Sequence, residues 1–272
     1  MFALIFGIIT RIFSNSFLNT FQKLCVNSGE KSSVVNFYMY LGLTLCGLLL
    51  CGNPIYNSNL LINVVIMGIL GALGNYFIIK ALSEGEMSVL APINSYKPIV
   101  ALIGGLILLG EVPGFKELFG VFLIIAGTFL LFNGKITSKK ALLYRFLALI
   151  FSGTEAVFIK KVIILSDINS AFLYWALAGL IFSVMIALKR PLKIKRINIK
   201  WQIGVIIAAL LMQYSTNYVF SRMNVAYALA LFQLSTIISV FLGVNIFKEK
   251  GLIRKLAASA VMITGAVLII LG

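Results

Sequence analysis

The chain has 272 residues, of which 61% are hydrophobic and only 11% are charged, and its mean hydropathy is +1.05. Soluble globular domains carry about a quarter charged residues, so this composition excludes a soluble or disordered protein and indicates an integral membrane protein. The formal net charge of +15 comes from 23 basic against 8 acidic residues. On so apolar a chain, the basic excess indicates loops at one membrane face and not binding to nucleic acid.

Cysteine and histidine usage argues against two further classes of protein. The three cysteines form no evenly spaced framework, and histidine is absent. We therefore expect no disulfide scaffold, no Cys/His metal site and no cofactor. The nucleotide-binding pattern G-x-x-x-x-G-K-[ST] is also missing from the sequence. The first apolar stretch has no basic flank and no small-residue cleavage pattern after it, so we expect it to be a retained span.

Ten apolar stretches fill most of the chain. A helix needs about 20 residues to cross a hydrocarbon core of about 30 Å, and each stretch is close to that length. The predicted spans are Phe2 to Gln22, Val34 to Cys51, Leu60 to Leu82, Met87 to Leu109, Phe115 to Asn133, Leu142 to Ile164, Ala171 to Leu188, Trp201 to Ser221, Val225 to Phe247 and Leu252 to Leu271. The short connections between them leave no room for a soluble domain.

The two halves of the sequence resemble each other. A shift of 138 positions brings the segment Phe13 to Ser16 onto Phe151 to Thr154, Glu111 onto Glu249 and Gly127 onto Gly265. We therefore predict an all-α integral membrane protein with ten transmembrane helices in two five-helix repeats, residues 1–134 and 135–272. An odd number of spans per repeat inverts the second copy, and the substrate site of such carriers lies between the halves. Chance similarity between apolar segments is the alternative.

Small and acidic residues recur at matching places in the repeat. The pairs Ala101/Gly105 and Ser239/Gly243 are spaced to let helix backbones approach closely, so we assign them to packing between the halves. Glu111 and Glu249 are expected to be structural residues at loop ends.

A set of loose motifs in the first half carries a family resemblance. Asn75-Tyr76 is followed by Lys80-Ala81-Leu82, by Pro92 and Pro98, by Leu109-Gly110-Glu111 and by a span that contains Gly120 and Gly127. This pattern resembles the EamA family of the drug/metabolite transporter superfamily over nearly the whole chain. The second half departs from it, with Thr236 at the position of Pro98. The resemblance implies a ten-helix carrier with a central cavity that alternates access and moves amino acids, metabolites or nucleotide-type solutes.

Loop charge predicts the orientation in the membrane. The loops after the odd-numbered spans hold seventeen Lys and Arg residues and those on the opposite side hold four, and the basic side normally faces the cytoplasm. We therefore expect an integral protein of the bacterial cytoplasmic (inner) membrane with both termini outside. A miscounted first span is the competing explanation.

Three ionisable residues lie inside predicted spans, namely Arg11, Lys97 and Glu155. A charge at the bilayer centre costs about 2.5–3.5 kcal/mol on insertion scales, so such groups normally face a cavity and mark a transport pathway. These three are the leading candidates for substrate binding. The alternatives are snorkelling of Arg11 along a tilted helix and a purely structural pairing of Glu155 with one cation.

Polar side chains extend this candidate site along two helices. Arg11, Asn15, Asn19 and Gln22 fall on one stripe at the 3.6-residue helical period, which we expect to face the bundle interior. In the fourth span, Pro98 should free the carbonyl of Asn94, and freed backbone is tolerated at membrane depth where it lines a cavity. Asn94 to Pro98 is therefore predicted to line the site. A proline kink without a ligand is the alternative.

The remaining candidates are amide and aromatic side chains on other spans. Hydrogen bonding between helices would explain some of the amides, and a place in the core or the interfacial belt would explain most aromatics. The candidates for substrate binding from this group are Tyr96, Trp175, Gln213, Tyr214, Asn217 and Gln233.

The charges favour transport of an anionic or zwitterionic solute. Two buried cations against one acid attract a ligand with a carboxylate or phosphate, which Arg11 could clamp through two hydrogen bonds and Lys97 as a point charge. Glu155 would receive an ammonium group or couple transport to protons. The expected partners are a small-molecule substrate and membrane lipid, with the protein a monomer or a homodimer.

Two other functions remain open from the sequence. One is a proton-coupled exporter of cationic or aromatic compounds that uses Glu155, and the other is a lipid-linked-sugar flippase or membrane scaffold. A membrane-embedded enzyme is not expected, because we find no paired-carboxylate motif and no histidine.

Overall fold

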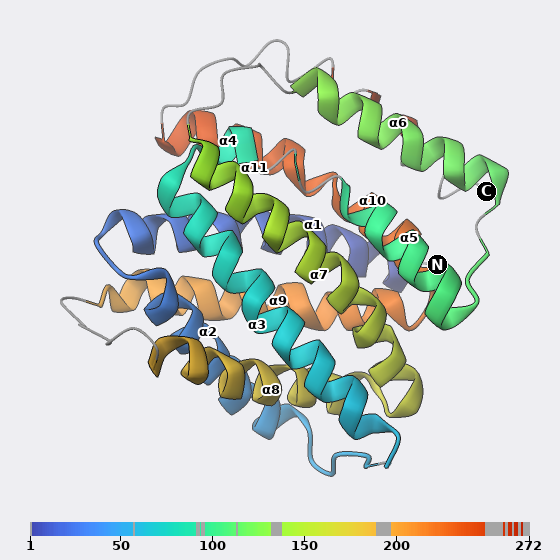
Figure 1. Ribbon diagram of the computed structural model, residues 1–272, viewed down its shortest axis with the longest axis horizontal. Helices are drawn as coiled ribbons and strands as arrows, with labels where there is room; N and C mark the ends of the chain where they lie inside the picture. The colour runs from blue at the N-terminus through green and yellow to red at the C-terminus, as the bar shows by residue number, and fades with distance from the viewer. Residues whose placement is uncertain are drawn as a thin grey trace.

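The computed structural model describes residues 2–56, 58–90, 93, 96–112, 114–131, 138–188 and 197–247, together with residues 258, 261, 262, 264, 265 and 268. All regular secondary structure in these residues is helical (Figure 1). The helices are α1 (Phe2–Asn27), α2 (Ser32–Leu50), α3 (Leu60–Glu84), α4 (Met87–Leu90), α5 (Lys97–Leu109), α6 (Phe115–Leu131), α7 (Lys139–Leu165), α8 (Ile168–Leu188), α9 (Ile199–Phe220), α10 (Val225–Phe232) and α11 (Ser235–Phe247).

Six stretches of the described chain are helical, long and apolar enough to cross a membrane. They comprise α1, α2, α3, α8, α9 and the stretch Val225–Gly243, which covers α10 and most of α11. Helix α5 and the Leu118–Gly127 part of α6 are apolar but shorter. The all-helical membrane protein predicted from composition is therefore confirmed. Of the ten predicted spans, six are long and apolar enough in the described chain to cross a membrane. Most of the tenth predicted span lies outside the described residues.

The most extensive helix contacts join the two halves of the chain. Helix α3 packs along α7, and α1 packs along α9; Figure 1 shows α3 and α7 side by side as a diagonal pair that crosses α1 and α9. Glycine, which has no side chain, allows α3 and α7 to approach closely. A Cβ at Gly74 would lie 3.3 Å from the backbone nitrogen of Ser152. Four long helices, two from each half, thus surround the middle of the bundle.

The fourth and ninth spans are interrupted where continuous helices were expected. The fourth consists of the short helix α4 and of α5, which begins at Lys97, and the ninth consists of α10 and α11. Pro98 therefore lies in the first turn of α5, where a missing N–H costs no helical hydrogen bond. Pro98 was expected to free the carbonyl of Asn94 inside a continuous helix; it lies instead in the first turn of α5, and Asn94 lies outside the described residues. In the second half, the nitrogen of Thr236 donates to the carbonyl of Gln233 at 2.8 Å, which closes a tight turn between α10 and α11.

Matching glycines of the two halves make reciprocal contacts. A Cβ at Gly127 would lie 2.9 Å from the carbonyl oxygen of Ala258, and a Cβ at Gly265 would lie 2.5 Å from that of Gly120. The 138-residue shift relates Gly127 to Gly265 and Gly120 to Ala258. Gly127 of the first half thus contacts the backbone at position 258 of the second half, and Gly265 makes the equivalent contact with position 120 of the first half.

Most of the described basic residues lie at the two ends of the bundle, and one end has more of them than the other. We call the end where α1 and α3 finish and α7 and α9 begin the basic end, and the opposite end the far end. Contacts join these helix ends, because the Phe21 and Trp201 rings lie 6.1 Å apart and Lys80 Nζ lies 4.0 Å from the Tyr144 ring centroid. The basic end carries Lys23, Lys31, Lys80, Lys139, Lys140, Arg145 and Lys200, and the far end carries Lys116, Lys160, Lys161 and Arg222.

Candidate functional site

A polar cavity of about 80 Å³ lies in the middle of the bundle. Residues from α1, α3, α7 and α9 form most of its wall, with Tyr40 of α2, Lys97 of α5, Trp175 of α8 and Leu229 of α10 completing it. A buried water needs about 10–15 Å³ of such volume, so the cavity has room for several water molecules. Ligand pockets commonly measure about 300–1,000 Å³, and the cavity is therefore narrower here than a bound metabolite needs.

Arg11 of α1 projects into this cavity from the middle of its helix. Its side chain is 7% exposed, and its Nε donates a hydrogen bond of 2.7 Å to Thr216 Oγ1 on α9. The guanidinium carbon lies 4.8 Å from the Phe232 ring centroid. Nη1 is buried and has no hydrogen-bond partner among the described residues. A buried charged donor without a partner is costly, so this atom is available to an anion.

Lys97 adds a second buried cation at the first turn of α5. Its side chain is 9% exposed, and Arg11, Glu155 and Arg145 all lie within its electrostatic range. Within the described ranges, no carboxylate comes within the 4.0 Å ion-pair distance of Arg11 or Lys97. The cavity wall itself therefore holds one more positive than negative charge, with neither cation directly paired.

Glu155 of α7 is held in one position by two neighbours. Trp175 Nε1 donates a hydrogen bond of 2.5 Å to Glu155 Oε1, and the carboxylate lies against the bare Cα of Gly71 on α3. A Cβ at Gly71 would overlap Glu155 Oε1 and lie 3.2 Å from Trp175 Nε1. The glycine therefore provides the space in which the buried carboxylate sits.

Replacing Gly71 by alanine should destabilise the protein. The added methyl must displace Glu155 or Trp175, and overpacking of this kind costs about 1–3 kcal/mol. Thermal unfolding of purified protein should show a melting temperature lower by about 5 °C. Gly52→Ala is the matched control, because nothing lies within 4 Å of a Cβ at Gly52. Equal melting temperatures for the two variants would contradict this account of Gly71.

The cavity is lined by half-buried residues toward the basic end. Four of its half-buried lining residues, Asn15, Asn19, Asn75 and Ile78, lie on the later halves of α1 and α3, which run to that end. An amide chain borders this side: Gln22 Nε2 donates to Asn75 Oδ1 at 3.1 Å, and Asn75 Nδ2 donates to Asn36 Oδ1 at 2.5 Å. The more accessible part of the cavity wall is therefore the part toward the basic end.

Aromatic rings and an ion pair close the far end. The rings of Phe220 and Phe232 stack with centroids 6.1 Å apart beside Arg11. Beyond them, Lys160 Nζ lies 2.5 Å from Glu111 Oε1 and donates to the carbonyl of Met223 at 2.9 Å. Glu111 Oε2 accepts a hydrogen bond of 3.1 Å from the nitrogen of Val225. The turn after α5 is thereby fastened to α7 and to the start of α10.

The structure brings most of the predicted site residues together in this cavity. The predicted residues that line it are Arg11, Asn15, Asn19, Lys97, Glu155, Trp175 and Gln213. Asn217 lies behind Gln213, to which it is hydrogen-bonded at 2.9 Å. Asn94 lies outside the described residues.

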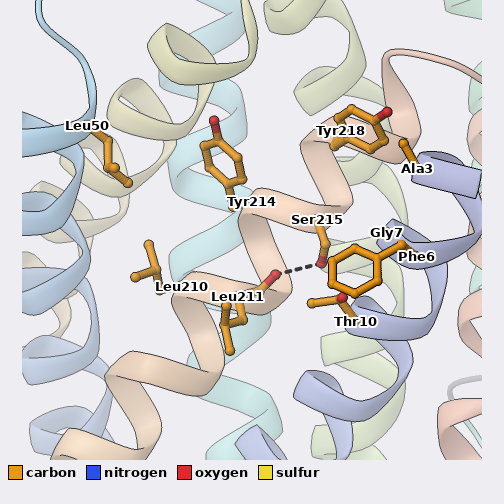
Figure 2. Close-up of a pocket in the computed structure, with 10 residues that line it drawn as sticks. All are labelled: Ala3, Phe6, Gly7, Thr10, Leu50, Leu210, Leu211, Tyr214, Ser215 and Tyr218. Atoms are coloured by element: carbon orange, nitrogen blue, oxygen red, sulfur yellow. Dashed lines mark hydrogen bonds between the residues drawn. The ribbon is translucent and has the colours of Figure 1, made fainter.

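Three predicted residues lie away from the cavity. Tyr96 packs edge-on against Phe129, with centroids 5.8 Å apart, and Gln233 donates to the carbonyl of Leu229 at 2.8 Å in the turn between α10 and α11. Tyr214 is 37% exposed and lines a separate pocket of about 550 Å³ between α1 and α9 (Figure 2). That pocket is mostly apolar, without a charged side chain, so it offers little binding chemistry for a polar solute. The structure therefore places Tyr214 outside the cavity that Arg11, Lys97 and Glu155 line.

Several cavity and buried residues were missed. Tyr40, Gly71, Asn75, Ser152 and Thr216 line the cavity but are not among the residues that the sequence predicted for the site. Arg145 was counted with the loops but is 4% exposed, and its Nε donates to the carbonyl of Leu90 at the end of α4. A buried cation near a helix end cannot be told from a loop cation by position along the chain.

Comparisons with known proteins agree on the family and the fold. The EamA-like transporter family model matches the chain twice, over residues 2–133 and 139–271. A solved structure titled only "Crystal structure of protein" aligns with a TM-score of 0.74 at 14% identity, covering 97% of this chain and 98% of that chain, which shows a shared fold alone. No curated protein matches the sequence. The two matches of the family model cover nearly the whole chain, and the chain therefore belongs to the EamA-like transporter family of membrane transporters.

Proposed function

We propose that the protein is a secondary carrier for a small anionic or zwitterionic metabolite, such as an amino acid. The observation that carries the proposal is the buried, unpaired Nη1 of Arg11 beside Lys97 in a polar cavity. Burying a charge without a partner costs several kcal/mol, so a site of this kind favours a ligand that supplies the missing charge. A carboxylate fits this role, with Arg11 directing it and Lys97 adding a point charge.

Glu155 is the complementary acid for the other end of a zwitterion. Trp175 occupies Glu155 Oε1, which leaves the second carboxylate oxygen for an ammonium group. The same carboxylate is our candidate for proton coupling. In the alternative exporter of cationic or aromatic compounds, Glu155 and Trp175 would bind the solute directly, but Arg11 and Lys97 would then repel it.

The mechanism in this proposal is alternating access by two inverted five-helix repeats, residues 1–134 and 135–272. The reciprocal glycine contacts and the interrupted fourth and ninth spans support such a repeat. Rocking of the halves would widen the basic end, loosen the Glu111–Lys160 contact and open the far end in turn. With the basic end on the cytoplasmic side of a bacterial inner membrane, both termini would lie outside.

Counterflow into proteoliposomes tests the charge requirement directly. Each of twenty amino acids is compared with the amine that lacks its carboxylate and with the carboxylic acid that lacks its amine. At least one amino acid should be exchanged, and its amine should be exchanged at least about tenfold more slowly because it leaves Arg11 unpaired. If amines were exchanged as fast as amino acids and depended on Glu155, the exporter alternative would replace this proposal.

A further inference from the structure

Tyr40 of α2 presents a buried hydroxyl that nothing in the described chain satisfies. Its side chain is 0% exposed and lines the central cavity. The hydroxyl has no hydrogen-bond partner among the described residues. Buried polar groups are nearly always hydrogen-bonded, and an exception at a cavity wall points to a partner from outside the protein.

Packing fixes the Tyr40 ring in this position. The ring lies with its centroid 5.1 Å from that of Trp175. On its other side it lies against the bare Cα of Gly179 on α8, where a Cβ would overlap the ring. Any side chain at position 179 would displace Tyr40, so the glycine keeps the tyrosine in the cavity wall. The hydroxyl is therefore held in place although it makes no hydrogen bond to the described residues.

The neighbourhood of the hydroxyl is the acidic side of the cavity. Tyr40 lies within electrostatic range of Glu155, and the same Trp175 that packs against Tyr40 donates to Glu155 Oε1. Among the described cavity-lining residues, Arg11 Nη1 and Gln22 Oε1 also have no hydrogen-bond partner, and Arg11 Nη1 is a charged N–H donor that suits an anionic group. A hydroxyl beside a carboxylate can accept a hydrogen bond from a cation that the carboxylate attracts.

We propose that Tyr40 is a specificity-determining residue whose hydroxyl accepts a hydrogen bond from the ammonium group of the cargo beside Glu155. This inference rests on the proposed function and narrows its substrate class to amino compounds that keep an N–H donor. A quaternary nitrogen has no hydrogen to donate, so it cannot make this hydrogen bond. A site built to hydrogen-bond a group strongly rejects an analogue without it.

The test is Tyr40→Phe, which removes only the hydroxyl. Thermal shifts of purified protein in detergent are measured with the amino acid that shifts the wild type most, and with its N,N,N-trimethyl derivative. In wild type, the amino acid should bind at least about tenfold more tightly than the trimethyl compound, and Tyr40→Phe should remove most of that preference. Without ligand, Tyr40→Phe should melt no lower than wild type, because it loses an unpaired hydroxyl.

Tyr214→Phe is the matched control. Its hydroxyl donates to Asn169 Oδ1 at 2.7 Å and lies outside the cavity, so the ligand preference should stay as in wild type. If Tyr40→Phe binds both compounds as wild type does, or melts lower without ligand, the assignment of Tyr40 is overturned while the proposed function stands. If no amino acid shifts the wild type, the proposed cargo is wrong and the assignment of Tyr40 fails with it.

Discussion

Replacing Lys97 by alanine is expected to reduce exchange of the best amino acid by about 100-fold, and Arg11→Ala should have an effect of similar size. Hydrogen bonds and ion pairs to charged groups contribute about 1.5–3 kcal/mol each when buried, and about 1.4 kcal/mol corresponds to tenfold. Both side chains are almost fully buried in the cavity wall. The measurement is counterflow into proteoliposomes with equal amounts of each folded variant.

Cations outside the cavity provide the controls for this prediction. Lys116 and Arg222 are exposed at the far end, so Lys116→Ala and Arg222→Ala should exchange the amino acid at close to the wild-type rate. Unchanged exchange in both Lys97→Ala and Arg11→Ala would remove the idea of a charge clamp. Loss in all four variants would indicate a general effect of net charge instead of a site.

Reversing the charge of Glu111 should give the largest loss of stability. Glu111 and Lys160 are 13% and 16% exposed and 2.5 Å apart, and breaking a pair buried to this extent costs about 3–5 kcal/mol. Glu111→Lys also places two cations together, so the melting temperature should fall by about 10 °C. Exchange should fall with it, because the far end of the cavity is no longer fastened.

The double variant Glu111→Lys/Lys160→Glu decides whether the pair is responsible. Restoring opposite charges should recover about half of the lost melting temperature. Recovery stays incomplete, because a lysine at position 111 cannot accept the hydrogen bond from the Val225 nitrogen. Glu84 is exposed, and Glu84→Lys should leave the melting temperature within about 2 °C of wild type. A double variant no more stable than Glu111→Lys would refute the pairing.

The sequence predicted the charged part of the cavity well because charge at membrane depth is rare. Arg11, Lys97 and Glu155 stand out in apolar spans, and the helical period relates Arg11 to Asn15 and Asn19 on one face. These arguments need only the position of a residue along its own helix. They succeed without knowledge of which helices are neighbours.

Helix neighbours explain the residues that the sequence did not assign correctly. Tyr40 and Tyr214 are both tyrosines within apolar helices, yet one lines the central cavity and the other lines a separate apolar pocket. What separates them is the packing of α2 and α9 against the rest of the bundle. The repeat does not help, because the 138-residue shift relates Lys97 to Ser235 and Glu155 to Phe17. The charges of the cavity belong to single positions and have no copy in the other half.

The free guanidinium nitrogen of Arg11 bears on the energetics of the whole transport cycle. Without bound substrate, the protein would have to pass between its two open conformations with an uncompensated positive charge buried away from water. Such a buried charge is energetically unfavourable. A bound solute with a carboxylate removes this energetic cost because it pairs with the guanidinium. Under the proposed alternating access, we therefore expect the conformational change to be faster with bound solute than without it, which favours exchange of solutes across the bilayer over net transport in one direction.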